Sequence, residues 1–323
     1  MCTAITFKTA DHYFGRNLDL EYSLNEQIII TPRNYPLLFR KHKTINHHYA
    51  IIGMAIVNSE YPLYYDATNE AGLSMAALNF PGNAVYRSYA FGKDNITPFE
   101  LIPWILAECK NIDEALFLLS KLNLLCENFS KQLPLSPLHW IVADSSQSVT
   151  VEPLSNGLQI HENPFGVLTN NPPFDFHMRN LENYLNVTSS EATNRFSKLL
   201  DLTPTSRGMG GIGLPGDLSS TSRFVRATFT KFNSQCGTSE QESISQYFHI
   251  LASVAQQNGC VQVGKAYEKT VYSSCCNTDK GIYYYTTYEN SQITAVSLFN
   301  ENLNANKLIA YPLITDQQIR FIN

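Results

Sequence analysis

Cys2 has the most specific chemistry in this sequence, because it stands directly behind the initiator Met1. A small second residue permits removal of the initiator, and the chain then begins with a free cysteine. Such a residue carries a thiol and an α-amine on one Cα, with ordinary pKa values of about 8.5 and about 7.7–8.0. Part of the amine is therefore neutral near neutral pH and can act as the base for the thiol. The pattern predicts an N-terminal nucleophile that needs no histidine partner.

The residues after Cys2 predict a β-hairpin that would position this nucleophile. Residues 2–7 alternate small or polar side chains with apolar ones, residues 9–11 are typical of a turn, and residues 12–19 form the returning strand. The hairpin brings Arg16 and Asp19 back toward the start of the chain. A guanidinium there favours the thiolate, and a carboxylate can hold or steer the amine. The alternative interpretation is an ordinary ion pair.

Composition excludes several classes of partner. Hydrophobic residues make up 44% of the chain and charged residues only 16%, which indicates a globular protein. The net charge of −5 and the pI near 5.9 argue against nucleic acid. We expect a small-molecule partner instead. The sequence contains neither a secretory signal pattern nor an apolar run of membrane-spanning length, so it predicts a cytoplasmic protein without membrane contact.

Metal and cofactor chemistry is not predicted. The seven cysteines are scattered without CxxC spacing, and the eight histidines have no metal-ligand spacing. The glycines of residues 208–213 lack the strand, helix and lysine of a phosphate-binding loop, so we interpret them as a mobile loop. We expect no metal, no cofactor and no disulfide framework.

The order of predicted elements indicates the α+β class in one domain over residues 1–323. Strands come first, then two helices, strands, helices and a final meander, without βαβ alternation or a linker rich in Gly, Pro or Ser. Residues 97–100 form a capping box that predicts a helix start, and residues 239–242 form a second one. Helical periodicity also predicts helices over residues 174–185 and 191–202. Residues 61–66 are expected to be aromatic and rich in turns.

Several short motifs, taken together and in order, resemble the choloylglycine hydrolase family, which contains bile salt hydrolases and penicillin V acylases. The motifs are Met-Cys-Thr at the start and residues 14–19, 78–80, 166–170, 214–217 and 222–224. The resemblance covers essentially the whole chain. It implies an N-terminal nucleophile hydrolase with a four-layer αββα sandwich, in which helices cover two mainly antiparallel sheets. It also implies removal of Met1 and a homotetramer.

The resemblance assigns roles to six residues of this chain. Cys2 is expected to be the nucleophile, Asp19 to bind the α-amine and Arg16 to stabilise the thiolate. The oxyanion would be held by the backbone N–H of Asn79 and the side-chain amide of Asn170. The sixth residue, Arg223, is expected to set the electrostatics of the pocket. By residue type alone, the two asparagines are typical turn residues at strand ends.

The substrate implied by the resemblance is a bile acid joined by an amide bond to glycine or taurine. A rigid apolar steroid needs a long apolar cleft with few polar groups. The residues expected to line it are Leu18, Leu20, Tyr22, Tyr65, Phe129 and Leu135, together with the rest of segments 61–65 and 129–135. Each of these is equally compatible with an ordinary place in the protein core.

Two other functions remain open at the level of sequence. One is an acylase of penicillin V or of another N-acyl amide, such as an acyl-homoserine lactone. Asn79 favours the bile salt hydrolases, because the penicillin V acylases of this family tend to carry tyrosine there. The other is a steroid-binding module without catalysis, which the complete set of six candidate residues argues against.

Overall fold

The computed structural model describes residues 1–323, and Cys2 begins the second strand along the path of its first sheet. That sheet has the order β12-β1-β2-β14-β15-β16, with β13 paired to β14. Every pair in it is antiparallel. The strands are β1 (Cys2–Lys8), β2 (His12–Leu20), β12 (Val167–Leu168), β13 (Val261–Val263), β14 (Ala266–Asn277), β15 (Ile282–Thr287) and β16 (Thr294–Ser297).

A second antiparallel sheet carries the remaining long strands, in the order β11-β10-β9-β6-β5-β4-β3-β17. Its strands are β3 (Gln27–Thr31), β4 (Ile51–Asn58), β5 (Tyr61–Asn69), β6 (Ser74–Asn79), β9 (Leu138–Ala143), β10 (Ser148–Leu154), β11 (Gly157–Glu162) and β17 (Ile309–Pro312). The short strands β7 (Asp94–Ile96) and β8 (Leu122–Leu124) form a separate parallel pair.

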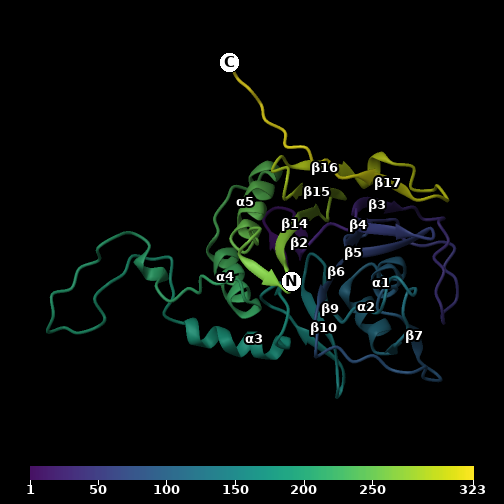
Figure 1. Ribbon diagram of the computed structural model, residues 1–323, viewed down its shortest axis with the longest axis horizontal. Helices are drawn as coiled ribbons and strands as arrows, with labels where there is room; N and C mark the ends of the chain where they lie inside the picture. Colours follow the sequence, from purple (N-terminus) through teal and green to yellow (C-terminus); the bar gives the residue numbers. More distant parts are fainter.

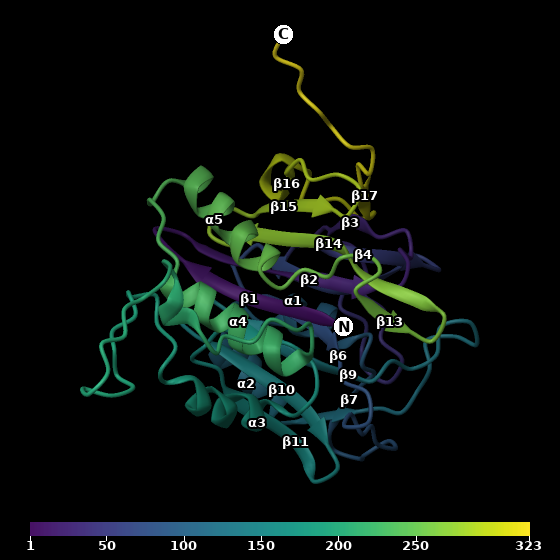
Figure 2. The same cartoon turned by 60° about the vertical axis from the view of Figure 1, so that its left-hand side comes forward.

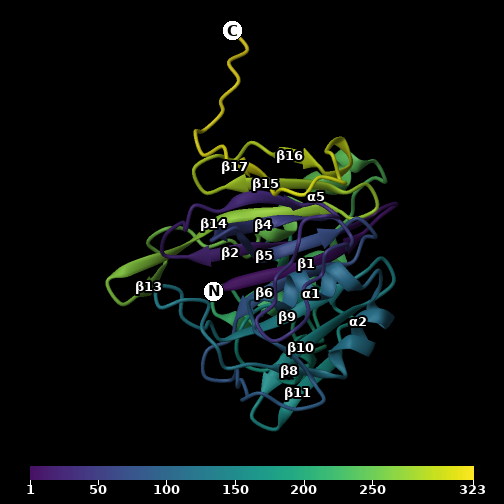
Figure 3. The ribbon, with the colours of Figure 1, turned by 90° about the vertical axis from the view of Figure 1, so that its right-hand side faces the viewer.

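Helices cover the outer faces of the two sheets (Figures 1 and 3). The second sheet is covered by α1 (Leu101–Glu108) and α2 (Ile112–Leu119), whose apolar residues share one core with it. The first sheet is covered by α4 (Ser220–Asn233) and α5 (Glu240–Ala252), with α3 (Phe174–Asn180) beside α4 (Figure 2). Apart from the core shared with α1 and α2, a second large core includes the apolar residues that lie between the two sheets. The predicted α+β class and the αββα layers are thus confirmed.

The register of the first hairpin decides which side chains meet. Seven antiparallel pairs run from Cys2 opposite Leu18 to Lys8 opposite His12. Side chains alternate between the two faces of a strand. Arg16 donates to backbone oxygens of the second sheet, so its face lies between the sheets, whereas Asn17 donates to Leu251 of α5 and therefore faces the helices. By this alternation Cys2 shares the face of Arg16, and Asp19 shares the face of Asn17.

Three local predictions differ from the structure. Residues 61–66 belong to strand β5 instead of a turn-rich segment. Residues 191–202, predicted as a helix, contain no helix. The first capping box does not start a helix at residue 98, because α1 begins at Leu101. Pro103 explains this last difference: in a helix starting at residue 98 its missing N–H would be needed in the interior, but it is tolerated in the first turn of a helix starting at Leu101.

The second capping box is confirmed, since Ser239 and Glu242 make both of its hydrogen bonds at the start of α5. Residues 174–185 are helical as predicted, with α3 followed by a short 3₁₀ helix, Leu181–Tyr184. The segment between this 3₁₀ helix and α4 projects away from the body of the molecule (Figure 1). None of the helices has both the length and the apolar character needed to cross a membrane.

Candidate active site

Cys2 is buried at the start of β1, with 3% of its surface exposed. Its backbone nitrogen donates to Asn170 Oδ1 at 2.8 Å. Arg223 of α4 donates through Nη1 to the Cys2 carbonyl and, at 2.6 Å, to Thr3 Oγ1. The same guanidinium donates through Nη2 to Asn170 Oδ1 at 2.7 Å. The two ends of the Cys2 backbone are therefore fixed by residues about 170 and 220 positions away in the chain.

Arg16 is fully buried between the sheets beside Cys2. Its Nη1 donates to the carbonyl oxygens of Tyr65, at 3.1 Å, and of Ala77. Its Nη2 has no hydrogen-bond partner. Burial opposes the charge of Arg16, but the nearby Cys2 and three further groups outweigh it and raise the pKa of the guanidinium. This arrangement keeps a buried positive charge next to the thiol.

Asp19 lies on the helix-facing side of β2, close to the chain start. Its Oδ1 accepts from Thr270 Oγ1 at 2.7 Å, while Oδ2 is buried without a partner. Burial raises the pKa of Asp19, although Arg223 and the N-terminal ammonium act in the opposite direction. The N-terminal ammonium of Met1 donates to the Asp19 carbonyl at 2.7 Å and forms an ion pair with the buried Glu268. Acceptors for an amine thus surround the start of β1.

Asn170 joins the two sheets through its side-chain amide. Oδ1 accepts from Cys2 and Arg223, so the NH₂ group points to the other side, where it donates to the Asn79 carbonyl at 2.7 Å. An amide NH₂ has two donors, and only one of them is needed for Asn79. The second is able to donate to a negative oxygen on a group attacked by Cys2. The structure therefore brings together Cys2, Arg16, Asp19, Asn79, Asn170 and Arg223.

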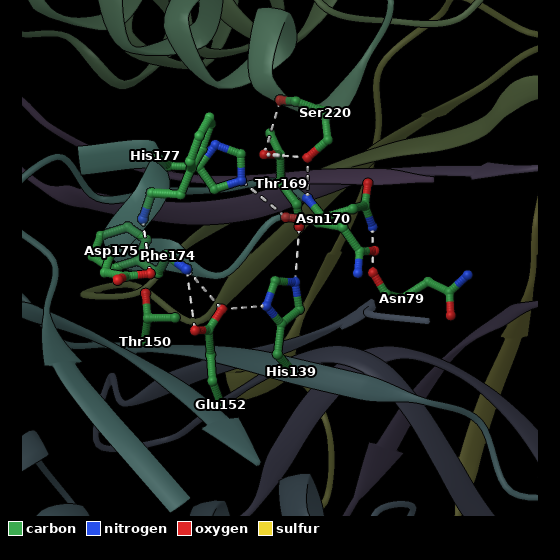
Figure 4. A network of polar contacts seen from close by, with 12 residues as sticks. Asn79, His139, Thr150, Glu152, Thr169, Asn170, Phe174, Asp175, His177 and Ser220 are labelled. Atoms are coloured by element: carbon green, nitrogen blue, oxygen red, sulfur yellow. Dashed lines mark hydrogen bonds and ion pairs between the residues drawn. The ribbon is translucent and has the colours of Figure 1, made fainter. Parts of the chain in front are cut away.

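A buried polar network holds the backbone around Asn170 (Figure 4). Its backbone N–H donates to Ser220 Oγ at 2.8 Å, and its carbonyl accepts from His177 Nε2 at 3.0 Å. One residue earlier, the Thr169 carbonyl faces His139 Nε2 at 3.0 Å, and His139 Nδ1 faces Glu152 Oε1 at 3.0 Å. Both ring nitrogens of His139 therefore lie at hydrogen-bond distance from an oxygen, and the ring links Thr169, directly after β12, to the Glu152 carboxyl group of β10.

An apolar cavity of about 190 Å³ lies between β5 and the loop that contains Phe129 and Leu135. Of the residues predicted to contact substrate, Tyr65, Phe129 and Leu135 line it. Leu18 is buried in the core, Leu20 is partly buried against that core, and neither lines the cavity. Tyr22 is 65% exposed and also lies outside the lining.

Four further lining residues belong to the expected segments 61–65 and 129–135: Leu63, Tyr64, Leu133 and Pro134. The sequence did not indicate the other seven: Leu24, Ile56, Ala77, Pro98, Phe99, Ser136 and Leu138. Sequence reasoning also missed Glu268, His139, Glu152 and His177. None of them belongs to a motif or a spacing pattern that would mark it. Their common signal is burial, which only the structure supplies.

Known proteins share this architecture. A model of the family described as "Linear amide C-N hydrolases, choloylglycine hydrolase family" matches residues 2–311. The chain belongs to the choloylglycine hydrolase family. It is 56% identical to the bile salt hydrolase/transferase of Lactiplantibacillus plantarum over 325 residues, covering 100% of both chains. It is 36% identical to the protein of the same description from Clostridium perfringens, again over 100% of both.

Solved structures extend the comparison. A crystal structure of a mutant conjugated bile acid hydrolase from Clostridium perfringens superimposes with a TM-score of 0.93 at 35% identity, covering 100% of both chains. The penicillin V acylase from Agrobacterium tumefaciens matches with a TM-score of 0.75 at 17% identity, over 96% of this chain and 90% of that chain. The second match shows that the fold is shared.

Proposed function

We propose that this protein is a bile salt hydrolase, which cleaves the amide bond joining a bile acid to glycine or taurine. The observation that carries the proposal is the position of Cys2 at the first residue of β1, fixed by Asn170 and Arg223 and next to the buried charge of Arg16. The relatives described as bile salt hydrolase/transferase and conjugated bile acid hydrolase support this choice of substrate. An apolar cavity bounded by Tyr65 suits the steroid part.

The proposed reaction begins after Met1 has been removed. The free α-amine of Cys2 accepts the thiol proton, and the sulfur attacks the amide carbon. The negative oxygen that develops is held by the free N–H of the Asn170 side chain and by the backbone N–H of Asn79. A preorganised donor of this kind typically lowers the barrier by about 2.7–4 kcal/mol. The proton then passes to the leaving nitrogen, the C–N bond breaks, and an acyl thioester remains on Cys2.

Water attacks the thioester in the second half of the reaction, with the same amine as base. The C–S bond breaks, the bile acid leaves, and the thiol is restored. In this scheme Asp19 orients the amine and Arg16 stabilises the thiolate, while Arg223 maintains the geometry of Cys2 and Asn170. The hydrogen bonds of Arg223 support its role, the nearby buried charge supports that of Arg16, and the N-terminal ammonium beside Asp19 supports that of Asp19.

The experiment that tests the function compares glycocholate, taurocholate and penicillin V on the same preparation. We expect clear hydrolysis of the bile salts and a much lower kcat/KM for penicillin V. A preference for penicillin V would reject the proposed substrate in favour of the acylase alternative. Cys2→Ala should abolish both activities, and turnover by this variant would reject the nucleophile. Intact mass of the active protein should lack Met1, because the mechanism requires a free amine on Cys2.

We also propose that the chain assembles into a homotetramer through the projecting segment between the 3₁₀ helix and α4. This segment exposes large apolar side chains, including Leu185, Phe196 and Leu199 at 84%, 84% and 94% exposure. An apolar groove of about 310 Å³ beside α4, lined by Leu181 and Phe229 among others, offers a matching surface on a second copy.

A reactive thiol is best preserved in a reducing compartment, which supports the cytoplasm as the proposed location.

A further inference from the structure

A buried polar cluster lies between the sheets behind Arg16. Its centre is Asp66 of β5, of which 1% is exposed. Asp66 Oδ1 accepts from the Tyr272 hydroxyl at 2.6 Å. Its Oδ2 accepts from the Tyr283 hydroxyl at 2.6 Å and from Ser274 Oγ at 3.1 Å. The second sheet therefore supplies the carboxyl group, and β14 and β15 of the first sheet supply the three hydroxyl groups.

The three hydroxyl groups are placed to favour the ionised form of Asp66, in opposition to the burial that raises its pKa. All three partners donate, so both oxygens of the carboxyl group act as acceptors and neither needs a proton. Burial raises the pKa of Asp66, while Arg16 and the three hydroxyl groups act in the opposite direction. A buried charge is costly unless it is paired. Arg16 supplies the compensating charge, and its backbone N–H also donates to Ser274 Oγ at 3.1 Å.

In the space between the sheets, Arg16 consequently lies near two acidic groups from different strands. One is the Cys2 sulfur on β1, and the other is Asp66 on β5. Two anions beside one guanidinium also repel each other. The net electrostatic stabilisation of each is therefore smaller than it would be if that anion were alone with the guanidinium. The titratable and charged groups around Cys2, Arg16 and Asp66 are Asp19 on β2, Tyr65 on β5, Arg223 on α4, Tyr272 and Cys276 on β14, Tyr283 on β15 and Tyr247 on α5.

We propose that Asp66 is a positioning residue for the reaction, which shares the charge of Arg16 with Cys2 and so limits how strongly Arg16 stabilises the thiolate. The inference rests on the proposed function, because it concerns Cys2 as the nucleophile. By sharing the charge of Arg16, Asp66 balances the fraction of Cys2 that is present as thiolate against the reactivity of that thiolate. A thiolate that is held too strongly is abundant but weakly nucleophilic, since nucleophilicity falls with basicity with a Brønsted coefficient of about 0.4–0.5.

The experiment measures alkylation of Cys2 by iodoacetamide as a function of pH, without any substrate, on protein that mass spectrometry shows to lack Met1. In Asp66→Asn, Arg16 keeps its position but loses one of its two anions. We expect the midpoint of the alkylation profile to move to lower pH by about 0.5–1 unit. The plateau rate should fall by about two- to threefold, which follows from that shift and the Brønsted coefficient.

The matched control is Asp144→Asn. Asp144 also accepts several hydrogen bonds, from the backbone of Ile112, Ser146 and Gln147, but it lies at the turn between β9 and β10, away from Arg16. This variant should keep the wild-type midpoint. A move to higher pH in Asp66→Asn would mean that Asp66 only holds Arg16 in place, and no move would mean that the two are uncoupled. Either result would overturn the proposal.

A second variant keeps the test valid if Asp66→Asn does not fold. Tyr272→Phe combined with Tyr283→Phe leaves Asp66 in place but removes two of its three hydrogen bonds, which favours its neutral form. The alkylation midpoint should move in the same direction as in Asp66→Asn, by a smaller amount, and an unchanged midpoint would overturn the proposal here too. Hydrolysis of bile salts by Cys2→Ala would instead reject the proposed function, a separate result from the alkylation profile.

Discussion

Asn170→Asp tests the oxyanion role most directly, because it changes one functional group and keeps the shape of the side chain. The wild-type Oδ1 accepts from Cys2 and Arg223, and an aspartate oxygen can continue to do so. The NH₂ group that donates to Asn79 is replaced by a second oxygen. The free donor is lost, and an acceptor now faces the Asn79 carbonyl.

The expected loss follows from the number of donors removed. Loss of one oxyanion donor typically costs about 2.7–4 kcal/mol of transition-state stabilisation, or roughly 10²–10³ in rate. The interaction forms only in the transition state, so kcat and kcat/KM should fall equally and KM should stay unchanged. Asn170→Ala should lose more, because it also leaves the guanidinium of Arg223 and the nitrogen of Cys2 without their acceptor.

The assay is steady-state hydrolysis of glycocholate, with each variant measured across a pH series and compared at its own optimum. The pH series is needed because a new carboxylate beside the Cys2 amine changes the basicity of that amine. Asn171→Asp is the control: its amide also donates to a backbone carbonyl, that of Pro81, but outside the catalytic group. A loss of less than fivefold in Asn170→Asp would refute the donor role and leave Asn170 as an acceptor for Cys2 and Arg223.

Three further predictions concern stability, assembly and substrate. Burial lowers the pKa of His12 from 6.5 to about 4, so the stability that its neutral form contributes above pH 6.5 is lost as pH falls toward 4. In urea titrations, His12→Asn should therefore lose less stability over this range than the wild type, by roughly 3 kcal/mol. Phe196→Asp with Leu199→Asp should convert the assembly to smaller species in light scattering. Phe129→Ser with Leu135→Ser should raise KM for glycocholate severalfold with a smaller effect on kcat.

Each of these predictions has a control on an exposed residue of the same type. His47→Asn should leave the pH dependence of stability unchanged, and a similar effect from it would contradict the burial argument. Phe91→Asp, at a residue 97% exposed and outside the projecting segment, should not change the assembly. Phe117→Ser on α2 should leave KM unchanged. An unchanged mass of the segment variant, or an unchanged KM of the loop variant, would exclude the corresponding surface.

Local sequence predicted those parts of the fold that local interactions determine. The hairpin around Arg16 and Asp19 has alternating residues and a short turn, and both its strands form as predicted. The segment 191–202 has helical periodicity but no surface to pack against, as the exposure of Phe196 and Leu199 shows. Short helices depend on such packing, so the periodicity alone was not sufficient.

Pro62 made residues 61–66 look like a turn. In the structure β5 pairs with β4 along this stretch, but it pairs with β6 only from Asp66 onward, so one side is open there. A residue without an N–H is tolerated on such an edge. The contacts of Asn170 with Cys2 and Arg223 join positions far apart in the chain, so only the resemblance to a family could suggest them. Asp66 and Glu268 have no motif, and nothing in the sequence showed that they are buried beside the site.

The register of β1 has a practical consequence for anyone who handles this protein. Strand β1 is hydrogen-bonded to β12 on one side and β2 on the other, and its first residue is Cys2. Under the proposed mechanism, a purification tag or fusion partner placed upstream must therefore be removed together with Met1, so that Cys2 carries a free α-amine. The opposite end of the chain extends away from the body of the molecule (Figure 1), so affinity handles and immobilisation chemistry belong there.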